Sequence, residues 1–144
     1  MMSRREFIAA SALAMAGCGS VGGTAAPDAV WGQQGLRDGA FVKPRAVGVK
    51  DARVYVIDTT GRIQIFSEDG EFLDLWNTPA MDNGTPTAVA FGHDGRVLIP
   101  DTHYHQILEY SPEGELLERW GSYGTGDDQF IYPTGIDQAN DGTL

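Results

Sequence analysis

The chain has 144 residues, 42% of them hydrophobic, which is enough for one globular domain. Ten Lys and Arg against twenty Asp and Glu give a formal net charge of −10. This charge argues against nucleic acid as a partner, because phosphate contacts need clustered cations. Nineteen glycines and seven prolines, among short runs of Val, Ile and Tyr, favour an all-β fold.

The first 18 residues have the pattern of an export signal. Arg4 and Arg5, followed at fixed spacing by an aromatic and an aliphatic residue, resemble the twin-arginine motif of bacterial export signals. The apolar stretch 7–16 is too short for a stable membrane anchor and is typical of a signal peptide. We therefore set residues 1–18 aside from the fold.

Cys18 is the only cysteine, so no intramolecular disulfide can form. It ends the sequence Met-Ala-Gly-Cys, which resembles a bacterial lipobox with Met15 in place of the usual Leu. Lipidation of Cys18 would anchor the protein to a membrane on the periplasmic or cell-surface side. Residues 19–30, rich in small residues, would then form a flexible tether. The alternative is that Cys18 is simply a small apolar residue of the signal.

From residue 31 the sequence repeats itself. Trp31, Trp76 and Trp120 are separated by 45 and 44 residues. A longer pattern recurs at an offset of 89, two repeat lengths, and pairs Trp31-Gly32, Gly35, Phe41 and Pro44 with Trp120-Gly121, Gly124, Phe130 and Pro133. A unit of about 43 to 47 residues is in the range of a β-propeller blade.

The unit itself has the pattern of four short strands. In the second copy we expect strands at 86–91, 96–100, 106–110 and 115–120, with tight turns at 93–95 and 111–114. A four-stranded sheet of this size cannot bury both faces alone, so the units should stack. Stacking around an axis produces a β-propeller.

Three motifs resemble the NHL repeat: Pro-x-Gly-Ile-Asp at 133–137, Asp-Thr with Ile-Gln-Ile-Phe within 58–66, and Gly-Glu-Phe-Leu at 70–73. The resemblance covers 31–144 and implies a propeller of four-stranded antiparallel blades, six in most members. The blades are 31–75, 76–119 and a partial 120–144. About two and a half blades do not close a ring, so we expect an N-terminal fragment of a longer propeller. Several short chains in one ring are the alternative.

The candidate ligand-binding residues are His103, Tyr104 and His105, which replace the Gly and Asn residues usual in this loop of the family. They lie in the connection between second and third strands, on the same face as the loops that follow the tryptophans. His93 is expected on the opposite face. His103 and His105 have a spacing that suits a divalent metal, but a site needs a third ligand. Candidates on this face are Asp38, Asp82, Asp127 and Asp128. Direct ligand contact is the favoured reading.

Three further positions have specific expectations. Arg45 is the charged residue that follows a blade-opening proline, and we expect it at the channel mouth, contacting an anionic ligand. Asp58 and Asp101 recur at one blade position, so we expect each carboxylate to accept hydrogen bonds from amides of the following loop. The tryptophans are expected to pack between blades.

The sequence thus predicts an exported, membrane-anchored NHL-repeat propeller that acts as a non-catalytic scaffold for a protein, peptide or glycan ligand. The alternative is a metal-dependent propeller enzyme of lyase or lactonase type, because propellers with this resemblance include such enzymes. No nucleophile–base motif or phosphate-binding glycine loop is apparent in the sequence after the signal.

Overall fold

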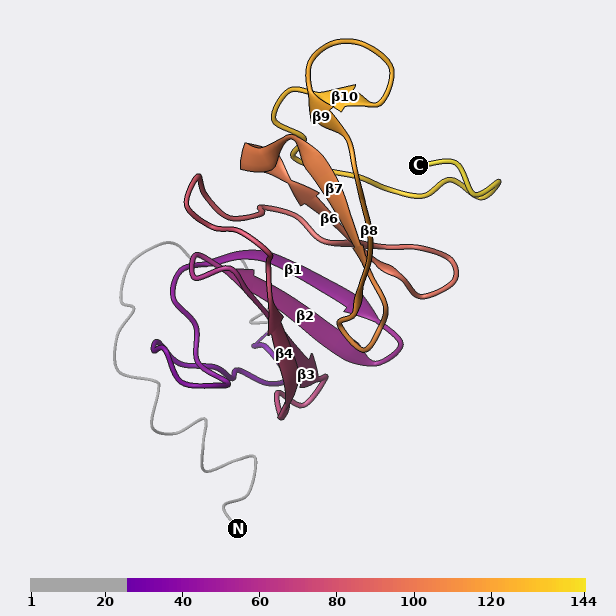
Figure 1. The fold of residues 1–144 in the computed structure, drawn as a ribbon. Helices are drawn as coiled ribbons and strands as arrows, with labels where there is room; N and C mark the ends of the chain where they lie inside the picture. The colour runs from indigo at the N-terminus through magenta and orange to yellow at the C-terminus, as the bar shows by residue number, and fades with distance from the viewer. Residues whose placement is uncertain (1–25) are drawn as a thin grey trace, which may run out of the picture.

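The computed structural model describes residues 26–144, which form two four-stranded sheets and a short two-stranded pair (Figure 1). Arg4, Arg5 and Cys18 lie outside the described residues. Within the described range, no helix has the length and apolar character needed to cross a membrane.

The first sheet contains β1 (Pro44–Lys50), β2 (Arg53–Asp58), β3 (Arg62–Ser67) and β4 (Phe72–Asn77). Each strand pairs with the next in antiparallel orientation, so sheet order follows chain order. The β1–β2 turn has Asp51 and Ala52 at φ of 50° and 59°. These values are typical of a tight hairpin turn that matches strand twist.

The second sheet repeats this order with β5 (Ala90–Phe91), β6 (Val97–Asp101), β7 (Gln106–Tyr110) and β8 (Leu116–Trp120). A 3₁₀ turn, η1 (Thr102–Tyr104), lies between β6 and β7. After β8, the short strands β9 (Ser122–Tyr123) and β10 (Gln129–Phe130) pair in parallel.

The expected strand 106–110 is confirmed, but the expectation of a strand over 86–91 is wrong, because only Ala90 and Phe91 join the ladder. In the first sheet, Ile57 pairs with Ala46. The equivalent residue on β6 is Pro100, which has no amide hydrogen for a neighbouring strand. The ladder therefore stops before it reaches that position.

The hydrophobic core lies between the two sheets. Every second residue of the central strands points into it, as the two-residue period of a strand requires. The buried members are at most 2% exposed: Tyr55, Ile57, Ile63, Ile65, Val97, Ile99, Leu108 and Tyr110. Burial of one such aliphatic side chain stabilises the fold by about 1.5–3 kcal/mol, so this interface holds the sheets together.

Two tryptophans pack in equivalent positions against the turn between the last two strands of a sheet. Trp76, on β4, contacts Tyr110 with ring centroids 5.7 Å apart and lies over Gly114 in the β7–β8 turn. Trp31 has the same relation to the first sheet, with its ring 5.0 Å from Phe66 and its atoms over Gly70. The expectation that the tryptophans pack between blades is confirmed for Trp76, which joins the first sheet to the second. Trp31 precedes β1 and packs on the first sheet alone among the described residues.

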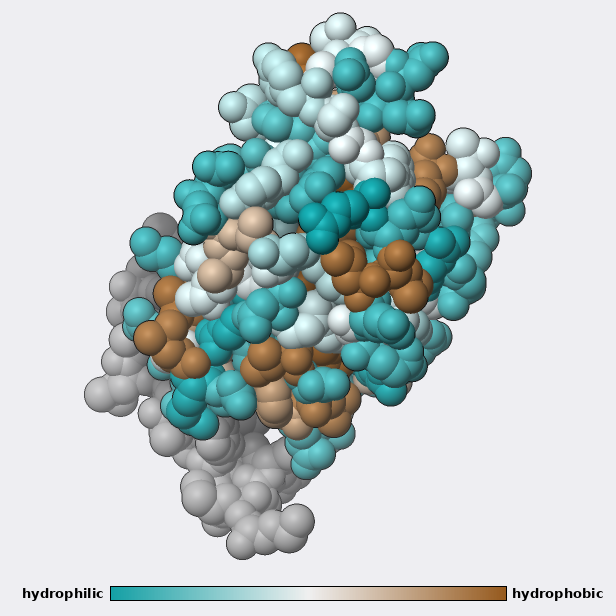
Figure 2. All heavy atoms as spheres, viewed as in Figure 1, coloured by the Kyte–Doolittle hydropathy of each residue, from teal (hydrophilic) through white to brown (hydrophobic). Residues whose placement is uncertain are grey.

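The other face of the first sheet is partly uncovered. Val47 and Val49 on β1 are 68% and 58% exposed, whereas their equivalents in the second sheet, Val89 and Phe91, pack against the core. A hollow of about 380 Å³ lies on this face, bordered by Val30, Val47, Val54 and Val56 among others. The face thus has the shape and polarity to receive another sheet. On the surface seen in Figure 2, apolar side chains form separate patches among hydrophilic ones.

Candidate functional site

The β6–β7 connection contains the predicted ligand-binding residues. Thr102 to Tyr104 form η1, and His105 follows in the left-handed conformation with φ of 55°. The shorter β2–β3 connection has Gly61 at this point, with φ of 71°. A residue other than glycine destabilises the fold by about 1–2 kcal/mol in the left-handed conformation. Contacts of the His105 ring must therefore offset that cost.

Neighbouring connections hold this loop on both sides. The Asn83 amide donates a hydrogen bond of 3.2 Å to the Tyr104 hydroxyl, and the His103 ring lies over Gly84. On the other side, the Tyr132 amide donates to Nδ1 of His105 at 3.1 Å. His103 to His105 therefore share a face with the connections that follow β4 and β8, as expected. His93 lies in the β5–β6 turn, at the opposite end of the sheet.

Two tyrosines extend the site. The His105 ring packs edge-on against Tyr123 and Tyr132, with centroids 4.9 and 4.7 Å apart, and His103 lies 6.2 Å from Tyr132. Tyr123, Tyr132 and the neighbouring Ile131 are 66%, 55% and 51% exposed. We call His103, His105, Tyr123, Ile131 and Tyr132 the aromatic patch.

Tyr123 and Tyr132 were not among the site residues inferred from sequence. The signal was present in the two-repeat alignment, where their equivalents are the polar residues Gln34 and Lys43. A change from polar to aromatic at two exposed loop positions has no packing cause within a blade. It therefore marks a surface that differs between the repeats.

The described residues do not form a metal centre of their own. Within 26–144, no three or more His, Cys, Asp or Glu side chains are close enough to hold one ion. Asp38, Asp82, Asp127 and Asp128 thus do not complete a site with the histidines. Moreover, Nδ1 of His105 already accepts the Tyr132 amide, which leaves one ring nitrogen for any ion.

Asp58 has the predicted structural role. Its carboxylate accepts hydrogen bonds from the amides of Val42 and Thr60 and from the Thr60 hydroxyl. It also pairs with Arg62 at 2.7 Å. Burial raises the pKa of Asp58, but the bonds from Thr60, Val42 and Arg62 outweigh it and leave the pKa below 3.8. Arg62 in turn donates to carbonyls of residues 36 and 40, which fixes the loop before β1.

The same expectation is wrong for Asp101. The extra residue of its loop forms η1, and the Asp101 side chain does not cap that turn. Its Oδ2 accepts instead from Nε2 of Gln106 at 3.0 Å, and its buried Oδ1 has no partner. Gln106 stands where the first sheet has Arg62, so the cation is missing. Burial therefore raises the pKa of Asp101 above 3.8, against smaller opposing effects of Gln106 and His103.

Arg45 lies at a β-bulge of β1 and is exposed. Its side chain makes no hydrogen bond or ion pair with the residues that the structure describes. The guanidinium is thus available to solvent, and an anionic partner for it stays a prediction.

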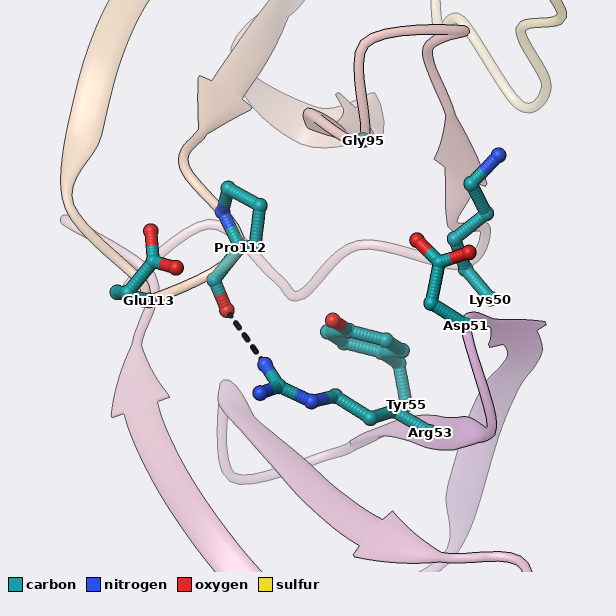
Figure 3. A pocket seen from close by; sticks show the side chains of 7 residues that line it. All are labelled: Lys50, Asp51, Arg53, Tyr55, Gly95, Pro112 and Glu113. Atoms are coloured by element: carbon teal, nitrogen blue, oxygen red, sulfur yellow. Dashed lines mark hydrogen bonds between the residues drawn. The ribbon is translucent and has the colours of Figure 1, made fainter.

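A second hollow, of about 220 Å³, lies at the turn end of the sheets, away from the aromatic patch (Figure 3). Its walls come from both sheets: Lys50, Asp51, Arg53, Tyr55, Gly95, Pro112 and Glu113. Nη1 of Arg53 donates to the Pro112 carbonyl oxygen at 3.5 Å, the outer limit of a hydrogen bond. Cations and carboxylates are mixed in this hollow, so it carries no net preference for one ligand charge.

Comparison with solved structures identifies the fold of the described residues. Virginiamycin B lyase from Staphylococcus aureus, as the selenomethionine protein, superposes with a TM-score of 0.56 at 19% identity, over 69% of this chain and 32% of that one. The described residues belong to a β-propeller. The two four-stranded sheets are two of its blades, so the ring within the described residues is incomplete.

A catalytically inactive histidine-to-alanine variant of the same lyase, with quinupristin, matches the propeller with a TM-score of 0.55, 18% identity and the same coverages of 69% and 32%. The chain thus spans about a third of the length of these structures. No protein-family model matches the chain, and no curated protein does. At this identity the likeness establishes the fold, and the NHL resemblance stays a prediction.

Proposed function

We propose that this protein is an exported, lipid-anchored NHL-repeat propeller that binds a protein, peptide or glycan through the loop face of its second blade. The observation that carries the proposal is the aromatic patch, in which Tyr123 and Tyr132, both more than half exposed, pack on the ring of His105. Exposed apolar side chains gathered at one place are typical of an interaction site. Tyrosine suits such a role because it offers contact area at a low entropic cost.

The patch also has a fixed shape. The Tyr132 amide bonds to His105, the His105 ring packs on both tyrosines, and Tyr104 bonds to Asn83. Such a preformed surface binds with a smaller loss of side-chain entropy than a mobile one. Two tyrosine rings stand at its exposed surface and no Ser or Cys nucleophile is bonded to His103 or His105 within the described residues, which supports binding over catalysis.

The test is to measure binding of the complete protein to peptide and glycan arrays, with and without the double substitution Tyr123→Ser and Tyr132→Ser. We expect the strongest ligands to lose at least tenfold in affinity, because two aromatic contacts disappear. Leu117→Ser is the control, since Leu117 is also 50% exposed but lies on β8, outside the patch. Equal binding by the double variant and the control would contradict the proposal.

Export and lipidation rest on Arg4, Arg5 and Cys18 alone. Replacement of both arginines by lysine should leave the precursor unexported, because lysine keeps the charge but not the paired guanidinium groups. Replacement of Cys18 by Ser should release exported protein from the membrane to the periplasmic or cell-surface fluid. Unchanged membrane association of the Cys18→Ser protein would count against the lipid anchor.

A metal-dependent enzyme is the second candidate, favoured by the structural likeness to a lyase. A divalent metal at His103 and His105 would need ligands from outside residues 26–144. Elemental analysis of the complete exported protein tests this reading. A bound divalent ion that is lost on substitution of His103 would support it, and metal-free protein that still binds its ligand would end it.

A further inference from the structure

The connections on the loop face of the second blade lack Lys and Arg. These three connections are 78–89, 102–105 and 121–133. They do have exposed carboxylates at Asp82, Asp127 and Asp128. The connection before the first blade, in contrast, contains Arg37 and Lys43. The negative charge of this face is thus a property of the second blade and the loop after it.

These carboxylates flank the aromatic patch. Asp127 and Asp128 lie in the turn between β9 and β10, which joins Tyr123 to Ile131 and Tyr132. Asp82 precedes Asn83, whose amide is bonded to Tyr104 on the other side of the patch. A ligand on the tyrosines would therefore lie between negative charges from two connections.

Aromatic faces and carboxylates favour the same type of ligand. The face of a tyrosine ring attracts Lys and Arg side chains through its quadrupole. Nearby carboxylates strengthen this attraction and raise the association rate of cations, and the net charge of −10 acts in the same direction. A neutral glycan would gain binding energy from the tyrosine rings but not from the carboxylates.

We propose that the partner of the aromatic patch is a basic peptide segment, with Lys or Arg side chains on Tyr123 and Tyr132 and their charges opposite Asp82, Asp127 and Asp128. This inference rests on the proposed function and specifies its ligand. The aliphatic parts of Lys and Arg would pack beside Ile131. The exposed His103 ring lies at the border of the contact.

The probe is a fluorescent eight-residue peptide of alternating Lys and Gly, measured by anisotropy against the complete protein. The comparison ligands are the same peptide with Ser for Lys and the neutral sugar cellohexaose. We expect binding of the Lys peptide only, with affinity that falls about tenfold between about 50 and 300 mM salt, as exposed charge pairs are screened. Tyr132→Phe should retain this binding and Tyr132→Ser should lose it, because the ring face is the contact.

A charge-matched pair of variants separates the local effect from overall electrostatics. Asp127→Asn with Asp128→Asn removes two charges at the patch, and Glu68→Gln with Glu113→Gln removes two from exposed turns at the opposite end of the blades. The first should weaken binding of the Lys peptide at least fivefold and the second less than twofold. Equal effects would overturn the proposal, because they indicate nonspecific attraction.

The outcomes also separate this inference from the proposed function. Binding of cellohexaose or the Ser peptide that depends on Tyr132 and not on salt would keep the loop face as a binding site but overturn the basic partner. Absence of any binding sensitive to Tyr132, across all three ligands and the arrays, would overturn both.

Discussion

Trp76 and Gly114 are complementary partners across the boundary between two blades: a Cβ atom on Gly114 would lie 2.3 Å from Cε3 of the indole. Trp31 and Gly70 repeat this relation one blade earlier, also at 2.3 Å. The glycine thus serves two purposes, since it permits a turn with φ of 87° and leaves room for the neighbouring ring. The recurrence explains why Trp and Gly repeat together in the sequence.

Gly114→Ala should therefore destabilise the protein by about 2–5 kcal/mol, the sum of left-handed backbone strain and displacement of Trp76. Gly95→Ala is the matched control, because Gly95 has nearly the same φ, 85°, and meets only the Pro112 ring at 3.7 Å. It should cost about 1–2 kcal/mol. Urea unfolding measures both. Equal losses of unfolding free energy for the two variants would contradict the prediction, because they would mean that the added methyl group on Gly114 does not disturb the Trp76 ring.

Ala52→Gly should stabilise the protein by about 1 kcal/mol. Ala52 has φ of 59° in the β1–β2 turn, a conformation that glycine adopts without strain. Ala90→Gly, on strand β5, is the control and should destabilise by about 0.5–1 kcal/mol through lost conformational restriction. The two free energies of unfolding should differ in sign, and a loss of stability in Ala52→Gly would contradict the assigned strain.

Asp58→Asn should destabilise by about 3–5 kcal/mol at neutral pH, since it leaves Arg62 buried without its counter-charge. The folded-state pKa of Asp58 lies below 3.8, so its contribution is complete above that pH and is lost as pH falls through the folded value. The difference from the natural protein should accordingly shrink below pH 3.8. Urea titrations at several pH values give this profile, and a pH-independent difference would contradict it.

Asp101→Asn should show the opposite trend. Because the folded-state pKa of Asp101 is raised, ionisation above 3.8 occurs first in the unfolded chain and lowers stability as pH increases. The Asn variant lacks this penalty and keeps an acceptor for Gln106. Its stability relative to the natural protein should hence rise from acid to neutral pH. A relative loss of stability over the same range would show that the carboxylate has a counter-charge in the folded state.

Gly84→Ala should displace the His103 ring, because the added Cβ would lie 2.3 Å from its Cδ2. The expected result is a large change in the His103 NMR resonances and weaker ligand binding at the aromatic patch. Gly142→Ala is the control, since that glycine also has positive φ but has open space around it. Unchanged His103 resonances in Gly84→Ala would place the ring elsewhere.

Much of the blade architecture could be predicted from sequence because the same pattern of strand and turn residues occurs in each repeat. Val56 and Ile99 occupy the same position of the same strand, and the turn glycines recur with them. The failures occur where the repeats differ. Pro100 shortens β5 by the loss of a single amide hydrogen, and η1 separates the Asp101 carboxylate from the loop amides that its equivalent binds. Such effects depend on hydrogen-bond direction, which a residue pattern does not contain.

The candidate site was predictable in part. The unusual residues His103 to His105 located the loop and its face, since connections of a propeller alternate between two ends of the blade. Tyr123 and Tyr132 are distant in sequence from this loop and join it only through the Tyr132–His105 hydrogen bond and ring packing. The repeat pattern places both connections on one face, but it does not specify the side-chain contacts between them.

The direction of the tryptophan contacts has a consequence for synthesis. Each indole precedes its glycine in the chain, so Trp76 leaves the ribosome before the β7–β8 turn that receives it. During that interval the first blade has its four strands but lacks the ring contact to its successor. We expect Trp76 to be exposed to solvent in nascent chains that end before Gly114 and to be shielded in longer ones. Each blade would therefore complete its packing only after the next blade has been synthesised.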